Sequence, residues 1–179
     1  MKGVIYTDIQ TMLDNNIDIT DILNNVRSIM EVEYPDYVEW FDEKVIPGLS
    51  LQERNIILIY KKNELIGFMN LKKTKKERKM SNLYIKPSFY YNTLNNKYFD
   101  KIIDISTEWL ETDEPIIIMP KKDYDKCAMI LFLNHWNVSR ILKKDNTIYY
   151  ILNGNYEFSD VEKSIKQKRK EYITNHQNN

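Results

Sequence analysis

Residues 115–119 (PIIIM) limit the possible folds of this chain more than any other stretch. Three isoleucines follow one another there, and no polar residue interrupts the run. A short, wholly apolar run of this kind predicts a strand that is buried on both faces, as in a parallel arrangement. The rest of the chain must then provide neighbouring strands, and helices that cover both faces of a sheet.

The other strand signals lie on both sides of this run. Two apolar runs (NIILIY and LIGFMNLK) around a turn at 61–64 predict a hairpin, and a second hairpin is expected around the turn at 144–146. Another strand is closed by Pro87, which cannot continue a ladder. The predicted strands are 55–60, 65–72, 80–86, 115–119, 136–142 and 147–152.

Apolar residues at helical spacing predict the helices that cover these strands. Thr20 is expected to cap the first helix, and Pro47 with Gly48 to end the second. Residues 1–19 carry no assignment beyond a turn at Asn15 and Asn16. The predicted helices cover 20–33, the stretch from Pro35 to Pro47, the stretch from Leu94 to Leu110, 122–134 and 159–174.

The composition favours a folded cytoplasmic protein. Apolar residues make up 42% of the chain, and lysine plus arginine equals aspartate plus glutamate at 26 each, so the charge gives no general attraction to nucleic acid. The single cysteine, Cys127, fits a reducing compartment. We expect no signal peptide and no membrane span, because no apolar run approaches about 18 residues.

The order of elements resembles the GNAT family of N-acetyltransferases over roughly residues 20–152. The resemblance is strongest at 83–103 (LYIKPSFYYNTLNNKYFDKII), a strand, a proline, a loop and an amphipathic helix. A second similar piece is 123–137 (DYDKCAMILFLNHWN), in which Ala128 and Leu131 fit the family's late helix. The resemblance implies an α/β (α+β) fold with a mixed, mostly antiparallel central sheet flanked by helices. We expect one domain at 1–158 and a C-terminal helical tail at 159–179.

The resemblance also implies a site for acetyl-CoA, as a co-substrate, where two central strands separate. The strand backbone at Leu83 and Ile85 would pair with the pantetheine arm. Donors of the following loop and the helix N-terminus would hold the pyrophosphate, since unpaired N–H groups favour an anion. The loop candidates are Tyr90, Tyr91, Asn92, Thr93 and Asn95.

This loop departs from the family pattern. The family's arginine or glutamine falls on Tyr90, and its two glycines fall on Thr93 and Asn95. The late-helix tyrosine that often protonates the leaving thiolate falls on Phe132. Tyr84 and Tyr124 are the remaining candidates for this acid, although buried tyrosines more often serve core packing.

Two interpretations follow from these residues. The first is an acyl-CoA-dependent N-acetyltransferase that transfers acetyl directly to an amine on a small molecule or a protein. It needs no metal and predicts an open notch between the strand at 80–86 and the central strand. The second is an inactive binding or interaction module of the same fold, in which Tyr84, Tyr90 or Phe132 fills that notch.

Three other features have competing interpretations. Cys127 could be a nucleophile, but a small buried hydrophobe is favoured, and two histidines are too few for a metal site. The basic run 72–79 (KKTKKERK) could contact the 3′-phosphate of CoA, nucleic acid or an acidic partner, but a solvated hairpin tip is favoured. The tail helix could cover a sheet edge or a partner subunit, which would make a homodimer.

Overall fold

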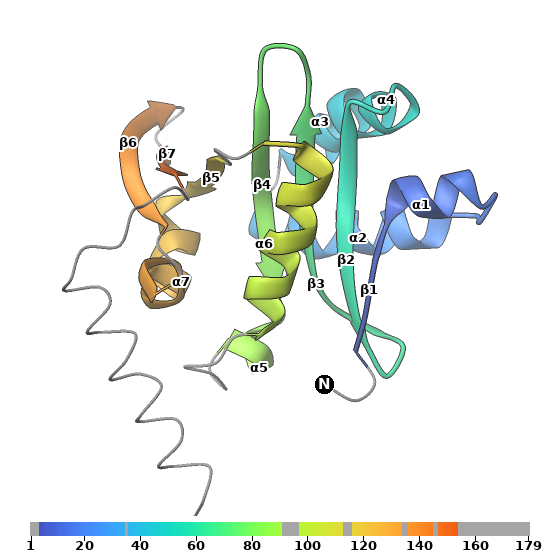
Figure 1. Cartoon of the computed structure of the whole chain (residues 1–179), viewed down its shortest axis with the longest axis horizontal. Coiled ribbons are helices and arrows are strands. Elements are labelled where there is room, and N and C mark those ends of the chain that lie inside the picture. The colour runs from blue at the N-terminus through green and yellow to red at the C-terminus, as the bar shows by residue number, and fades with distance from the viewer. Residues whose placement is uncertain are drawn as a thin grey trace, which may run out of the picture.

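The computed structural model describes residues 4–34, 36–90, 97–112, 116–133, 136–144 and 147–153. Within them, seven strands form one sheet in the order β1-β2-β3-β4-β5-β7-β6 (Figure 1). Neighbouring strands are antiparallel except β4 and β5, which run parallel, so the predicted mixed and mostly antiparallel sheet is confirmed. The strands are β1 (Val4–Asp8), β2 (Arg54–Lys61), β3 (Glu64–Lys73), β4 (Arg78–Ile85), β5 (Ile116–Pro120), β6 (Asn137–Lys144) and β7 (Thr147–Asn153).

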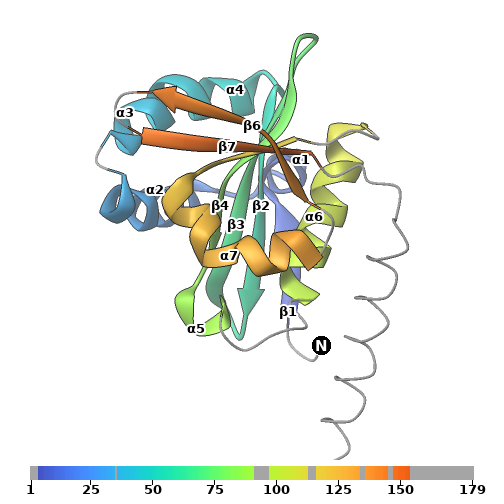
Figure 2. The same ribbon diagram turned by 90° about the vertical axis from the view of Figure 1, so that its left-hand side faces the viewer.

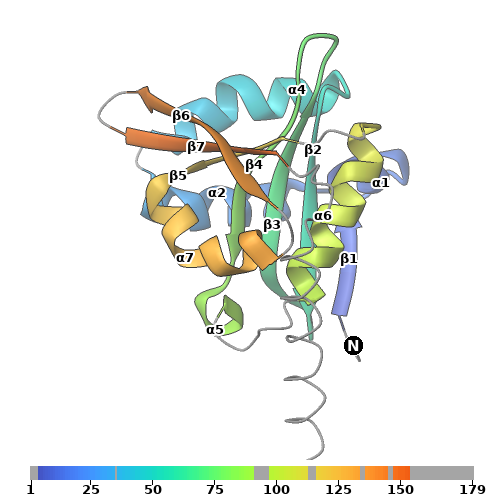
Figure 3. The ribbon, with the colours of Figure 1, turned by 60° about the vertical axis from the view of Figure 1, so that its left-hand side comes forward.

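Helices cover both faces of this sheet. In Figure 1, α6 lies in front of β2–β4, and α2, α3 and α4 lie behind them. Figure 3 shows α7 on the same side of the sheet as α6. The helices are α1 (Ile9–Asp14), α2 (Thr20–Glu33), α3 (Tyr37–Trp40), the π-helical η1 (Phe41–Val45), α4 (Ile46–Ser50), α5 (Pro87–Tyr90), α6 (Lys97–Leu110) and α7 (Lys121–Leu133).

Two hydrophobic cores follow from the alternation of side chains along the strands. Ile56 and Leu58 of β2 point into the core under α1–α4, which we call the α2-side core. Ile57 and Ile59 point into the core under α6 and α7, the α6-side core. Because both faces are covered, the central strands are apolar at nearly every position.

The structure corrects two local predictions. Thr20 is the first residue of α2 and Ile19 holds the cap position, while the Asp18 carboxylate accepts the Thr20 N–H at 2.9 Å. The second helix does not end at Pro47 and Gly48 but continues to Ser50 as α4. The π-helical turn before Pro47 makes this possible, because it changes the hydrogen bonds where proline lacks an N–H.

The hairpin between β3 and β4 carries the basic run. Glu77 binds Lys72 and Lys79 at 2.7 and 2.6 Å, and Lys73 binds Glu111 at 2.9 Å. Arg78 donates to the carbonyl of Leu110, the last residue of α6, at 3.1 Å. Lys73 and Arg78 therefore tie the hairpin to the C-terminus of α6, where cations are favoured. The tail at 159–179 lies outside the described residues, so the domain limits stay a prediction.

Candidate functional site

The parallel pairing between β4 and β5 is short. It joins Lys79, Met80 and Ser81 to Ile116, Ile117 and Ile118, and within the described residues it ends there. β4 then continues along β3 to Ile85, while β5 continues along β7 to Pro120. Figure 2 shows β6 and β7 running across the direction of β2–β4, as this separation requires. We call residues 82–85 and 119–120 the ladder gap.

The backbone of β4 becomes irregular where the gap begins. The β3–β4 register shifts between Phe68 and Asn70, and Asn82 has a φ of 49°. Such a bulge bends and twists a strand. Gly67 lets β3 approach β4 closely, since a Cβ there would lie 3.0 Å from the carbonyl oxygen of Tyr84. The bulge and this close approach hold the end of β4 on β3 and away from β5.

The free backbone edge of β4 faces the gap. The Lys86 N–H donates to the Ile66 carbonyl of β3 at 2.8 Å. Because backbone groups alternate between the two edges of a strand, the N–H and C=O of Ile85 point away from β3, as does the C=O of Leu83, whose peptide partner is the N–H of Tyr84. The side chains of both residues are buried in the α6-side core. Only their backbone groups are therefore placed to bind a ligand in the gap.

Tyr84 lies on the α2 side of the sheet. Its ring stacks on Phe68 with centroids 5.2 Å apart and packs against the α2-side core. Nearby on this side, Asn70 of β3 pairs with Ser81 and donates its Nδ2 to the Tyr37 hydroxyl at 3.0 Å. Burial raises the pKa of Tyr37, so this hydroxyl stays neutral.

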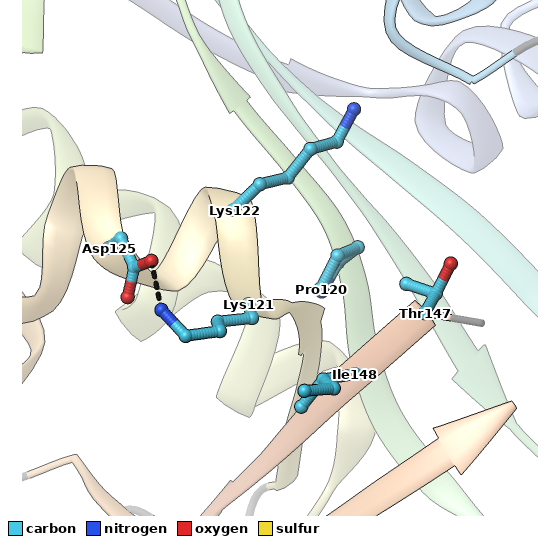
Figure 4. Close-up of a pocket in the computed structure, with 6 residues that line it drawn as sticks. All are labelled: Pro120, Lys121, Lys122, Asp125, Thr147 and Ile148. Carbon is cyan, nitrogen blue, oxygen red and sulfur yellow. Dashed lines mark hydrogen bonds and ion pairs between the residues drawn. The ribbon is translucent and has the colours of Figure 1, made fainter.

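Tyr124 lies on the other side of the sheet. Its ring packs against the α6-side core and lies 4.7 Å from the ring of Tyr150, centroid to centroid. The structure therefore places the two candidate acids on opposite faces rather than in one cluster. A shallow depression lies beside the first turns of α7, between the end of β5 and the start of β7 (Figure 4). It is lined by Pro120, Lys121, Lys122, Asp125, Thr147 and Ile148.

The chain after β4 holds the predicted loop. Pro87 opens the short helix α5, a position that proline favours, and Tyr90 is its last residue. The Tyr90 side chain lies outside the described residues, as do Tyr91, Asn92, Thr93 and Asn95 and the side chains of Cys127 and Phe132.

One contact near the gap has no signal in the sequence. Tyr34, which follows α2, donates its hydroxyl to Asp123 of α7. The Lys122 ammonium lies 4.0 Å from the centroid of the same ring. Tyr34 and Asp123 are 89 positions apart, so no local spacing could have paired them. The contact joins the helix on one side of the gap to the helix that follows β5.

The part of the chain that the structure describes lacks both a metal-binding cluster and a membrane-spanning helix. It holds no group of three or more His, Cys, Asp and Glu side chains that could bind a metal ion. No helix there combines the length and apolar character needed to cross a membrane.

Comparisons with known proteins give matches in structure only. No protein-family model matches the sequence, and no curated protein matches it. A GNAT-family acetyltransferase from Bacillus cereus has a TM-score of 0.59 and 9% identity, over 87% of this chain and 99% of that chain. The PaiA N-acetyltransferase from Thermoplasma acidophilum, in complex with coenzyme A, has a TM-score of 0.53 and 16% identity, over 86% and 99%.

Mutant forms of SpeG, a spermidine/spermine N-acetyltransferase from Vibrio cholerae, give a TM-score of 0.52 and 11% identity, over 86% of this chain and 94% of that chain. Identities this low establish the fold and nothing finer. The order of the strands, the single parallel pair at the centre of the sheet and these similarities agree: the chain has the GNAT fold.

Proposed function

We propose that this protein is an acyl-CoA-dependent N-acetyltransferase that transfers acetyl directly from acetyl-CoA to an amine. The observation that carries the proposal is the ladder gap, with the backbone of Leu83 and Ile85 facing it. An extended pantetheine arm has amide groups that pair with such an edge as a further strand would. The CoA complex of the structurally similar PaiA protein supports a CoA ligand.

The pyrophosphate would lie beyond the end of β4. The N-terminus of α6 offers backbone N–H groups and the positive end of a helix dipole, which together favour an anion. We propose that Tyr90, Tyr91, Asn92, Thr93 and Asn95 line this part of the site. Asparagine tolerates a left-handed backbone better than most residues, so Asn95 could replace one glycine of the family loop.

Direct transfer needs one proton removed and one proton supplied. The acceptor amine must lose a proton to attack the thioester carbonyl, and the leaving CoA thiolate must gain one. We propose Tyr84 and Tyr124 as candidate donors to the thiolate, one from each face of the sheet. The acceptor is an amine-bearing small molecule or protein; the SpeG similarity supports an amine.

The alternative is a binding module that has lost CoA. It required large side chains to fill the gap, and Tyr84 was one candidate. The stacking of Tyr84 on Phe68, on the α2 side of the sheet, favours the enzyme instead.

Calorimetric titration with acetyl-CoA, CoA and ADP tests the proposal. ADP carries the pyrophosphate without the pantetheine arm, so it separates the two halves of the site. We expect micromolar binding of acetyl-CoA and CoA and much weaker binding of ADP. No heat and no thermal shift at millimolar acetyl-CoA would exclude the enzyme. Equal affinity for ADP and CoA would contradict the role of the β4 edge.

A further inference from the structure

Two neighbouring lysines open α7, and they point in different directions. β5 ends at Pro120, and α7 begins with Lys121 and Lys122 without an intervening loop. Lys121 lies along the helix and binds the Asp125 carboxylate, whereas Lys122 extends away from both (Figure 4). The first turn of α7 therefore sends one primary amine away from its own helix.

The Lys122 amine lies beside Tyr34, in the first turn of the helix that follows the β5 side of the ladder gap. Its Nζ is 4.0 Å from the centroid of the Tyr34 ring, a distance at which an ammonium is attracted by an aromatic face. Tyr34 is itself fixed by its hydrogen bond to Asp123. Tyr34 also packs against the same α2-side core as Tyr84, which lies on β4 beyond the pairing of that strand with β5. The amine is thus held between the end of α2 and the end of β5.

We propose that Lys122 is an acetyl acceptor within the same molecule, so that the protein acetylates itself at this residue. The inference rests on the proposed function, because acetyl-CoA is the acetyl donor. It also identifies the class of amine that the acceptor side accommodates, which is a primary amine on an unbranched alkyl chain. The ring of Tyr34 positions that chain.

The reaction balances without another reagent. The neutral Lys122 amine attacks the thioester carbonyl carbon, the new C–N bond forms, and the C–S bond breaks. The CoA thiolate leaves and takes up one proton, and the amide nitrogen loses one. Lys122 is exposed to solvent, so water can take the proton that its ammonium gives up before the attack.

Lys121 and Lys126 provide matched controls on the same helix. Lys121 is bound to Asp125, and Lys126 lies 3.5 Å from Asp123. Both are exposed like Lys122, so reaction with acetyl-CoA in bulk solution would modify all three lysines at similar rates. A positioned amine reacts faster because it has a high effective concentration. We expect Lys122 to react at least about tenfold faster than either control.

The experiment incubates the full-length protein with acetyl-CoA and follows each lysine by peptide mass spectrometry. We expect acetylation of Lys122 first, at a first-order rate that does not depend on protein concentration. Lys122→Arg should remove this product and leave the slow labelling of Lys121 and Lys126 unchanged. Tyr34→Phe keeps the ring and should keep most of the rate, whereas Tyr34→Leu should lower it about tenfold.

Several outcomes would overturn the inference. Equal labelling of the three lysines, or equal labelling of heat-unfolded protein, would mean simple chemical acetylation. A rate that rises with protein concentration would mean transfer between two copies. Calorimetric binding of acetyl-CoA without acetylation of Lys122 would overturn this inference and leave the proposed function intact. Absence of acetyl-CoA binding would overturn both.

Discussion

The two ends of β4 differ in what surrounds them. The start of β4 pairs with β3 along one edge and with β5 along the other, at Lys79, Met80 and Ser81. Met80 is fully buried there. At the end of β4, Tyr84 and Ile85 pair with β3, the described pairing with β5 has already ended, and Asn82 between the two parts has a positive φ. The start of β4 is therefore bonded to a strand on each edge, whereas its end is bonded to β3 and has no described pairing with β5.

This difference separates stability from ligand binding along a single strand. Changes at the start of β4 should lower the free energy of unfolding and leave the free edge intact in the molecules that remain folded. Changes at its end should weaken acetyl-CoA binding more than they weaken the fold. Five substitutions test this division, from the largest expected effect to the smallest.

Met80→Ala should have the largest effect on the fold. It removes a fully buried side chain from the α6-side core beside Ile117, and such truncations cost about 2–5 kcal/mol. Urea denaturation measures the loss, and calorimetry under native conditions should find the acetyl-CoA affinity within a factor of about three. A large loss of affinity in folded protein would show that the two ends of β4 are coupled.

Two adjacent proline substitutions compare the two edges of the strand directly. Tyr84→Pro removes an N–H that faces β3 and should cost about 3 kcal/mol or more. Ile85→Pro removes the N–H that faces the gap and leaves the bonds to β3 intact. We therefore expect the free energy of unfolding to fall by only about 1–2 kcal/mol, from lost side-chain volume. This substitution should also weaken acetyl-CoA binding about tenfold, the value of one hydrogen bond. Unchanged affinity in Ile85→Pro would contradict pairing of this edge with the pantetheine arm.

Gly67→Ala should disturb the end of β4 through its neighbour. The added Cβ would lie 3.0 Å from the Tyr84 carbonyl oxygen and 3.2 Å from the Ile59 Cδ1, so β3 and β4 must move apart. We expect a loss of about 1–3 kcal/mol in thermal or urea unfolding. The acetyl-CoA affinity should fall with it, because β4 forms one side of the gap. A stable variant with normal affinity would show that this close approach is unnecessary.

Glu77→Gln tests the hairpin at the start of β4. Burial tends to raise the pKa of Glu77, but the hydrogen bonds from Lys72 and Lys79 outweigh it and the pKa is lowered. The ionised form is therefore stabilised by folding, which adds stability above pH 4.5 that is lost as the pH falls below it. Because Glu77 and its lysine partners are partly exposed, we expect the substitution to lower the free energy of unfolding by less than about 1 kcal/mol. Unfolding measured at acid and neutral pH should show a weaker pH dependence in the variant.

The sequence was sufficient to predict the helices and strands whose own residues show a strong apolar pattern. The helix predicted at 20–33 is α2, and the strands predicted at 55–60 and 65–72 are β2 and β3, each with one additional residue at each end. β1 was missed, because its five residues are defined by pairing with β2 rather than by their own composition. The continuation of the helix through Pro47 depends on a π-helical turn that apolar spacing does not encode.

The candidate site was predictable only where strand alternation applies. Leu83 and Ile85 share one face of β4, and Tyr84 points to the other, as period-two alternation requires. The separation of β4 from β5 and the contact of Tyr34 with Asp123 depend on how distant segments pack. The residues around these segments carry no sequence pattern from which the separation or the contact could be predicted.

The three residue pairs that join β4 to β5 also have a mechanical meaning. The backbone pairing between the β1–β4 and β5–β7 parts of the sheet is three residue pairs long, and the contacts of Tyr34 with Lys122 and Asp123 also join the two parts. Local opening of this short ladder breaks far fewer hydrogen bonds than unfolding of the chain, so it should require a smaller free energy. Hydrogen exchange should therefore be faster at the β4–β5 ladder than at the β2–β3 ladder, and a ligand bound in the ladder gap should slow it.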